Sequence, residues 1–311
     1  MKKLTLLIPT IALVASCGGT NPSLRQTDLR IISPTGAPAV SMYNFVNGLS
    51  TVINPKTELL PEFKKDNFDI IIAPAKGGLT QIVKQNSAYQ MAAVVTFGNF
   101  ALVSTGKDDN GTLDAGDNVL IFQKEDIPGS VFNYLYGDLE LNVYDVPDVS
   151  ATVSPLNTGT YSSSSGTVEL DYIFSAYPVI SNVKKTSQVV EKASDAFAKK
   201  TGGKRIIQAA VFINKNLSKE RADNFLSLLE QDMTSAVSDP NNIVTTFNLF
   251  GGESEQKNMF GVAASAVYDA MSDRNGLGLG YQRAKDAKDE INYFINDIMK
   301  SGLELDEKVY Y

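Results

Sequence analysis

The sequence of 311 residues contains no histidine, and it contains a single cysteine, Cys17. Without histidine there is no Ser-His-Asp or Cys-His catalytic arrangement and no imidazole–zinc site. One cysteine near the chain start leaves no pair for a disulfide and no thiolate ligands for a metal in the remaining chain. The absences therefore exclude much nucleophilic and metal-dependent chemistry.

Cys17 closes a segment with the features of a bacterial lipoprotein signal. Lys2 and Lys3 precede an apolar run, Leu4–Ala15, which is shorter than the roughly 20 apolar residues that span a bilayer. The letters "VASC" at residues 14–17 then resemble a lipobox, whose cysteine becomes the first mature residue and carries a diacylglycerol. We therefore predict a signal peptide at 1–16, lipidation of Cys17 and a polar tether at 17–25. The alternative is an ordinary cleavage site followed by a partly buried free cysteine.

The charge balance of the mature chain is acidic. Cleavage before Cys17 removes Lys2 and Lys3, which leaves 26 cationic residues against 35 acidic ones and a net charge of −9. An acidic surface repels nucleic acid and anionic lipid headgroups. We expect no nucleic-acid partner, and we expect membrane contact through the acyl chains alone.

Apolar strand-like runs alternate with helical patterns along most of the chain. Because continuous apolar strands separated by helices indicate a mainly parallel sheet covered on both faces, the pattern predicts an α/β fold. Strands are predicted at 29–33, 68–74, 89–97, 100–105, 118–122, 140–146, 170–176 and 205–214. Helices are predicted at 128–136, at 187–200, after an N-cap at Ser218, and at about 281–300. The Ser/Thr-rich stretch 150–167 is interpreted as a loop or a weakly amphipathic helix inside a domain.

Two motifs fail the tests for ligand sites. The acidic segment 108–117 has Leu113 at the sixth and Val119 at the twelfth position, counted from Asp108, where a calcium loop needs glycine and glutamate. Glycines 276, 278 and 280 have the wrong spacing and position for a dinucleotide fingerprint. Both are interpreted as turns or loops, and no metal or cofactor site is predicted.

Three predicted strands end in turns built from small residues, "SPTGAP" at 33–38, "APAKGG" at 73–78 and "TFGN" at 96–99. Ligands of open α/β sheets bind outside the carboxyl ends of the strands, where small residues let backbone amides approach the ligand. Each such turn alone is also explained by the need for small residues between a strand and a helix. Three together indicate a site, for which we predict Ser33, Thr35, Gly36, Ala37, Pro74, Ala75, Thr96, Gly98 and Asn99.

The order of these pieces resembles a solute-binding lipoprotein of an ABC importer with the type II periplasmic-binding-protein fold. Within that class the chain is most similar to the group that binds nitrate, alkanesulfonates and aminopyrimidines. The matching segments are "RIISPTGAPAVSMYNFV", "FDIIIAPAKGG", "FALVST", "GTVELDYIFSAYPVISNV" and "AAVFINKNLSKERADNFL". The stretch 150–165 departs from the pattern, because the resemblance implies a helix there.

The resemblance implies two α/β lobes joined by a hinge, with crossings near 102–106 and 206–212. Residues 26–102 and 210–311 would form the first lobe, and residues 103–209 the second. The ligand would lie between the lobes, with Ser175, Tyr177 and Pro178 closing over it and the Tyr177 ring stacking on a flat solute. Lys76 is the only cationic residue at the three turns, so we expect a neutral or weakly anionic solute.

The resemblance also implies a monomeric, extracytoplasmic, lipid-anchored receptor that delivers a small solute to an ABC permease without catalysis or a cofactor. Two alternatives come from other classes: an adhesion or scaffolding lipoprotein, and a surface enzyme that uses carboxylates. The acidic residues gather in solvated segments such as "KDAKDE" and "LELDEK", which disfavours the enzyme. Scaffolding proteins are more often β-rich and repetitive, which disfavours the scaffold.

Overall fold

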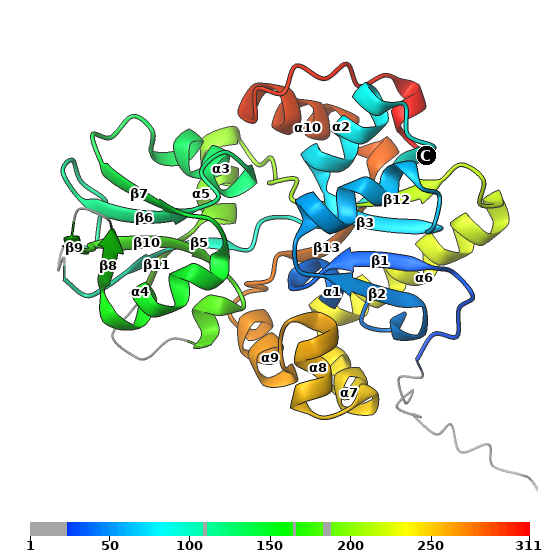
Figure 1. Cartoon of the computed structure of the whole chain (residues 1–311), viewed down its shortest axis with the longest axis horizontal. Coiled ribbons are helices and arrows are strands. Elements are labelled where there is room, and N and C mark those ends of the chain that lie inside the picture. The colour runs from blue at the N-terminus through cyan, green and yellow to red at the C-terminus, as the bar shows by residue number, and fades with distance from the viewer. Residues whose placement is uncertain (1–23, 108–110, 164–165, 183–187) are drawn as a thin grey trace, which may run out of the picture.

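The computed structural model describes residues 24–107, 111–163, 166–182 and 188–311. It forms two lobes side by side, each with its own β-sheet flanked by helices (Figure 1). The predicted signal peptide, the lipidation site Cys17 and most of the tether at 17–25 lie outside the described residues.

The first lobe is built on a six-stranded sheet of order β13-β4-β12-β3-β1-β2. Its strands are β1 (Ile31–Pro34), β2 (Leu49–Val52), β3 (Ile70–Pro74), β4 (Tyr89–Thr96), β12 (Ala209–Asn214) and β13 (Leu279–Arg283). β1 pairs in parallel with β2 and β3, whereas β12 runs antiparallel to both β3 and β4. β1, β3 and β4 therefore have their carboxyl ends at the same edge of the sheet.

The second lobe is built on a five-stranded sheet of order β11-β5-β10-β6-β7. Its strands are β5 (Phe100–Ser104), β6 (Asn118–Phe122), β7 (Asn142–Val146), β10 (Tyr172–Ala176) and β11 (Gln188–Lys192). β6 is parallel to β7 and β10, and β5 is antiparallel to β10 and β11. A separate hairpin consists of β8 (Thr160–Ser163) and β9 (Gly166–Glu169).

The α-helices cover both sheets: in Figure 1, α2 and α10 lie on one side of the first sheet and α7 to α9 on the other. They are α1 (Ala37–Val40), α2 (Ala75–Gln85), α3 (Ile127–Tyr136), α4 (Val153–Thr158), α5 (Ala193–Thr201), α6 (Lys219–Ser238), α7 (Asn241–Phe250), α8 (Glu253–Phe260), α9 (Ala264–Ser272) and α10 (Lys288–Asn292). Short 3-10 or π segments are η1 (Val46–Gly48), η2 (Pro55–Leu59), η3 (Leu60–Lys64), η4 (Val149–Thr152), η5 (Val179–Asn182), η6 (Ala284–Asp286), η7 (Tyr293–Ile298) and η8 (Glu307–Val309).

Hydrophobic burial explains the central strands and the longest helix. Every residue of β10 and β12 is buried, as expected for strands covered on both faces. In α6 the predicted apolar face is buried, and the Ser218 side chain accepts a hydrogen bond from the Arg221 N–H at 3.4 Å. This is the N-cap that the sequence predicts.

The α/β class and the two-lobe architecture agree with the sequence analysis, but both sheets are mixed. The antiparallel strands β5 and β12 arise where the chain crosses between lobes, because a strand that enters from the other sheet runs in the reverse direction. The first crossing lies at residues 97–99, between β4 and β5, whereas the expected crossing at 102–106 overlaps the last residues of β5 and those that follow it. The second crossing follows α5 and precedes β12.

Two local predictions need correction, and a third is confirmed in part. Residues 188–192 of the predicted helix at 187–200 form the edge strand β11. The predicted helix at 281–300 begins as strand β13 and becomes helical at η6 and α10. In the first two cases tertiary pairing at a sheet edge prevails over a helical pattern. The Ser/Thr-rich stretch contains η4, α4 and β8, so it includes a short helix as well as a hairpin strand.

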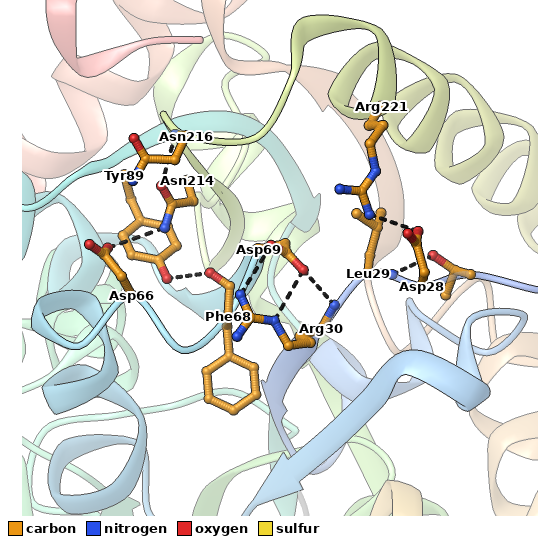
Figure 2. A network of polar contacts seen from close by, with 11 residues as sticks. Asp28, Leu29, Arg30, Asp66, Phe68, Asp69, Tyr89, Asn214, Asn216 and Arg221 are labelled. Atoms are coloured by element: carbon orange, nitrogen blue, oxygen red, sulfur yellow. Dashed lines mark hydrogen bonds and ion pairs between the residues drawn. The ribbon is translucent and has the colours of Figure 1, made fainter.

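The amino-terminal edge of the first sheet is held by hydrogen bonds between strand ends (Figure 2). The Arg30 N–H donates to the Asp69 carboxylate at 2.8 Å, and the Asp69 N–H donates to the Arg30 carbonyl at 2.9 Å. The Tyr89 hydroxyl donates to the Phe68 carbonyl at 2.5 Å, and the Asn214 N–H donates to the Asp69 carbonyl. These contacts tie β1, β3, β4 and β12 together at the edge opposite the predicted site, so we assign them to stability.

None of the helices formed by the described residues combines the length and the apolar character that crossing a membrane requires.

Candidate ligand-binding site

The carboxyl edges of the two sheets face each other because the first crossing is short. β4 ends at Thr96 and β5 begins at Phe100, and Phe100 pairs with Ala176 at the carboxyl end of β10. On the other side, Ala209 at the start of β12 pairs with Thr96 and Pro74. We call these two opposed carboxyl ends of the sheets the facing edges.

All the residues predicted for the site lie at the facing edges. Pro74 ends β3 and Thr96 ends β4, while Ser33 and Ser175 each lie one residue before the end of β1 and β10. Thr35, Gly36, Ala37, Ala75, Gly98, Asn99, Tyr177 and Pro178 follow these strands directly. Strand direction therefore brings together residues from both lobes that are distant in sequence. Their role in ligand binding remains a prediction.

Three backbone amides of the first two turns, which we expected to approach a ligand, donate to carbonyl groups of neighbouring segments instead. The Thr35 N–H donates to the Val52 carbonyl at 2.9 Å, and the Gly36 N–H donates to the Phe260 carbonyl at 2.7 Å. The Ala75 N–H, at the start of α2, donates to the carbonyl of Gln208 at 2.9 Å. These turns are thus fixed by neighbouring segments, and Gly36 adopts a φ of 88° that favours glycine.

Asn99 joins both crossings and the second lobe through its side-chain amide. The Gln208 side chain donates to Asn99 Oδ1 at 2.7 Å and accepts from the Asn99 N–H at 3.2 Å. The Asn99 side chain also donates to the Tyr177 carbonyl at 2.5 Å, and the Tyr177 N–H donates to the Asn99 carbonyl at 2.8 Å. Gln208 was not predicted for the site, because the sequence analysis placed it inside the predicted strand 205–214; β12 begins one residue later, at Ala209.

Ser175 and Thr152 form a buried hydroxyl pair in the second lobe. Their Oγ and Oγ1 atoms are 2.7 Å apart, and both residues have no exposed surface. Thr152 also donates to the Val149 carbonyl at 2.7 Å, so Ser175 is the donor between the two hydroxyls. Thr152 comes from the Ser/Thr-rich stretch, whose many hydroxyls gave no local signal that one of them reaches β10.

Tyr177 is enclosed by the loop that follows α9. Its residue surface is 4% exposed, and its hydroxyl donates to the Asp273 carboxylate. A Cβ atom added at Gly276 would lie 2.9 Å from two atoms of the Tyr177 ring. The expectation of an open ring face with an available hydroxyl is therefore not met in this structure.

Lys192 completes an ionic cluster with Asp273 and Tyr177. The Lys192 side chain is 5% exposed, and its Nζ lies 3.1 Å from Asp273 Oδ1 and 5.3 Å from the Tyr177 ring centroid. Burial, followed by the hydrogen bond to Asp273, raises the pKa of Tyr177. Burial alone would raise the pKa of Asp273, but hydrogen bonds from Tyr177 and Lys192 outweigh it and hold that pKa below its ordinary value. The ion pair between Asp273 and Lys192 thus links the loop between α9 and β13 to strand β11 of the second lobe.

Two hollows lie beside the second crossing. One, with a volume of about 560 Å³, is lined by 202–205, Gln282 and 285–290. The other, of about 370 Å³, is lined by Phe97, Ser194, Arg205 and residues of 274–281. Arg205 contributes to both, and its guanidinium stacks 4.2 Å from the Phe97 ring centroid while pairing with Glu290 at 2.7 Å. Neither hollow is lined by the predicted turns at 33–37 and 74–75.

We compared the sequence and the structure of the chain with those of known proteins. No family model matches the sequence, and no curated protein matches it. Solved structures do match. An ABC transporter structure from Parabacteroides distasonis has a TM-score of 0.69 and 13% identity, over 92% of this chain and 99% of that one.

Two further structures match with lower TM-scores. The periplasmic aliphatic sulphonate binding protein SsuA from Escherichia coli has a TM-score of 0.57 and 9% identity, over 88% of this chain and 89% of that one. The desulfurization enzyme DSZB has a TM-score of 0.54 and 9% identity, over 86% of this chain and 92% of that one. The chain therefore has the fold of ABC-transporter substrate-binding proteins, as the resemblance predicted, and that fold also occurs in an enzyme.

Proposed function

We propose that this protein is the solute-binding component of an ABC importer and binds one small molecule between its facing edges. The observation that carries the proposal is the opposition of the two carboxyl edges across a three-residue crossing. Ligands of α/β sheets bind at such edges, and a two-lobed protein can enclose a ligand by closing about its crossings.

The proposed role is binding and delivery rather than catalysis. The sequence has no histidine and only Cys17 as a thiol. Among the described residues, no three acidic or cysteine side chains gather in a way that would hold a metal ion. The residues that we propose to contact the solute or to support those contacts are Ser33, Thr35, Pro74, Thr96, Asn99, Ser175 and Pro178, with hydroxyl and amide groups in the majority.

The proposed site favours a neutral or weakly anionic solute. Lys192 and Arg205 are each paired with a carboxylate, so their charges are already balanced. We include sulfonates among the candidate solutes because one of the matching structures is a sulphonate binding protein. Lipidation at Cys17, an extracytoplasmic location, a monomeric state and delivery to a membrane permease complete the proposal.

A thermal-shift screen tests the binding role. Purified protein is heated with a library of neutral metabolites, flat-ring compounds and alkanesulfonates, and a specific ligand at 100 times its Kd should stabilise the fold by about 2.7 kcal/mol. Calorimetric titration of each hit should give a stoichiometry of one, and small-angle scattering should show a smaller radius of gyration at saturation. Saturable binding without any compaction would contradict binding between the lobes.

A further inference from the structure

An ion pair joins the two lobes at a distance from both crossings. Lys56 lies in η2, directly after the edge strand β2 of the first lobe, and Asp126 precedes α3 of the second lobe. Lys56 Nζ is 2.7 Å from Asp126 Oδ2. In sheet order, β2 is four strands away from β4, the strand that leads into the first crossing. The pair therefore connects the parts of the lobes that a hinge motion would separate.

Local structure leaves the Asp126 carboxylate available for this contact. Asp126 is the N-cap of α3, where an aspartate normally accepts hydrogen bonds from the second or third helical N–H. Here the second helical residue is Pro128, which has no N–H, and the N–H of Gly129 donates to the Gln123 carbonyl at 3.4 Å. The Asp126 side chain makes no capping hydrogen bond and reaches Lys56 in the other lobe instead.

Lys56 is likewise not neutralised within its own turn. Glu58, the nearest carboxylate in η2, accepts hydrogen bonds from the backbone N–H groups of Ile53 and Asn54, at 3.2 and 2.7 Å. The Asn54 side chain accepts from the Lys56 N–H at 3.1 Å and caps the segment. The turn is thus ordered by Asn54 and Glu58, while the Lys56 ammonium extends to the second lobe.

The exposure of both partners makes the contact weak and reversible. Their side chains are 67% and 33% exposed, and exposed ion pairs change an equilibrium only about two- to fivefold at most. Salt screens such charges, with a Debye length of about 8 Å at physiological ionic strength and about 3 Å at 1 M. A pair of this strength suits a contact that forms and breaks with lobe movement.

We propose that Lys56 and Asp126 form a clasp that stabilises the closed arrangement of the lobes and weakens with rising ionic strength. The proposal rests on the hinge motion of the proposed function. The clasp adds a ligand-independent, salt-sensitive contribution to closure, so the affinity for the solute should fall when the clasp is removed, even though neither residue belongs to the predicted contact set.

Interlobe distances measured on the full chain test the clasp without any ligand. A Cys17→Ser background has no cysteine, so spin labels can be attached at Ile53→Cys and Leu139→Cys, which are 86% and 38% exposed in opposite lobes. Double electron–electron resonance should give a closed and an open population in low salt. Lys56→Gln should shift the ratio toward the open population by about two- to fivefold, and 1 M NaCl should abolish the difference from the parent.

Two variants make the test specific. Lys107→Gln removes an ion pair of the same 2.7 Å length with Glu169, but both residues of that pair lie in the second lobe, so the distance distribution should not change. The exchange variant Lys56→Asp with Asp126→Lys should restore the parent ratio. Identical distributions for Lys56→Gln and the parent in low salt, or an equal shift in Lys107→Gln, would overturn the clasp. Neither result bears on the metabolite screen, which tests the proposed function separately.

Discussion

Asp273 ties two residues of the second lobe, Tyr177 and Lys192, to the loop that precedes β13. It accepts from the Tyr177 hydroxyl and pairs with Lys192, and it lies 96 residues from Tyr177 in the sequence. A tyrosine interpreted from sequence as a stacking surface is therefore a partner in an ionic cluster. In this structure the Tyr177 hydroxyl donates to Asp273 and the Tyr177 ring is buried, while the Asp273 side chain is partly exposed.

Replacing Asp273 should lower stability in a pH-dependent manner. Asp273→Asn leaves the buried Lys192 ammonium without its carboxylate, and because Asp273 is 44% exposed we expect a loss of about 1–2 kcal/mol at pH 7. The folded pKa of Asp273 lies below its ordinary 3.8, so its contribution is full above that value and disappears as the pH falls through the folded pKa.

Urea denaturation of both proteins between pH 7 and pH 3 measures this difference. The free energies of unfolding should differ at pH 7, and the difference should narrow once the pH falls below 3.8. Asp195→Asn provides the control, because its pair with Arg274 is 59% and 74% exposed, and it should change stability by less than about 0.5 kcal/mol. A constant gap across the whole pH range would show that the Asp273 charge is not responsible.

At the level of elements, α2 depends on a close approach to the sheet. Gly78 faces Phe212 of β12, and a Cβ atom there would lie 2.2 Å from the Phe212 ring. The neighbouring Gly77 would place a Cβ 3.1 Å from the end of the flexible Leu60 side chain. The two glycines of "AKGG" therefore have different roles, although the sequence analysis treated both as small residues for a ligand.

The Gly78→Ala variant should lose about 1–3 kcal/mol of stability, because the added methyl group clashes with a fully buried ring. Gly77→Ala is the matched control, and its gain of up to about 1 kcal/mol in helix propensity should offset the small movement of Leu60. Thermal denaturation should therefore give a lower midpoint for Gly78→Ala than for Gly77→Ala. Equal stability would show that α2 shifts to accept the methyl group. Phe212→Leu should restore part of the loss in Gly78→Ala.

At the level of the whole molecule, the described chain forms two lobes that meet at their facing edges, and the proposed lipid at Cys17 would hold them at a membrane. The first described strand, β1, begins at Ile31, so the residues between Cys17 and β1 would serve as the connection. The anchor would then restrict the protein to one surface while leaving the lobes free to move.

Cys17→Ser should abolish membrane attachment. Lipidation is the only anchor that the sequence predicts once the apolar run is removed, and two acyl chains are sufficient for stable attachment. Fractionation of cells should find the variant as unprocessed precursor or as released protein, whereas Ser16→Ala, which keeps a small residue before the cysteine, should stay in the membrane fraction. Processed Cys17→Ser protein that remains in the membrane fraction would refute the lipid anchor.

The sequence alone determined the features that depend on local pattern. The buried strands β3, β10 and β12, the N-cap at Ser218 and the small turns at strand ends all follow from burial, capping and turn chemistry within a few residues. Because parallel strands place their carboxyl ends together, the predicted turns at 33–38, 73–78 and 96–99 could be assigned to one edge before the structure was known. Asn99 belongs to the third of these turns, whereas the placement of Ser175 and Tyr177 opposite them followed from the resemblance to the binding-protein family.

Tertiary structure decided which partners those residues have. Gln208, Thr152 and Asp273 reach Asn99, Ser175 and Tyr177 from distant segments, and periodicity within a short window carries no information about such pairs. Edge strands β11 and β13 were predicted as helix because they are only partly buried and so lack the continuous apolar run of a central strand. Their pairing with neighbouring strands outweighs the weak local preference for helix. The backbone N–H groups of Thr35, Gly36 and Ala75 were likewise assigned to a ligand. The carbonyl groups that accept their hydrogen bonds belong to distant segments, which only the folded chain places beside them.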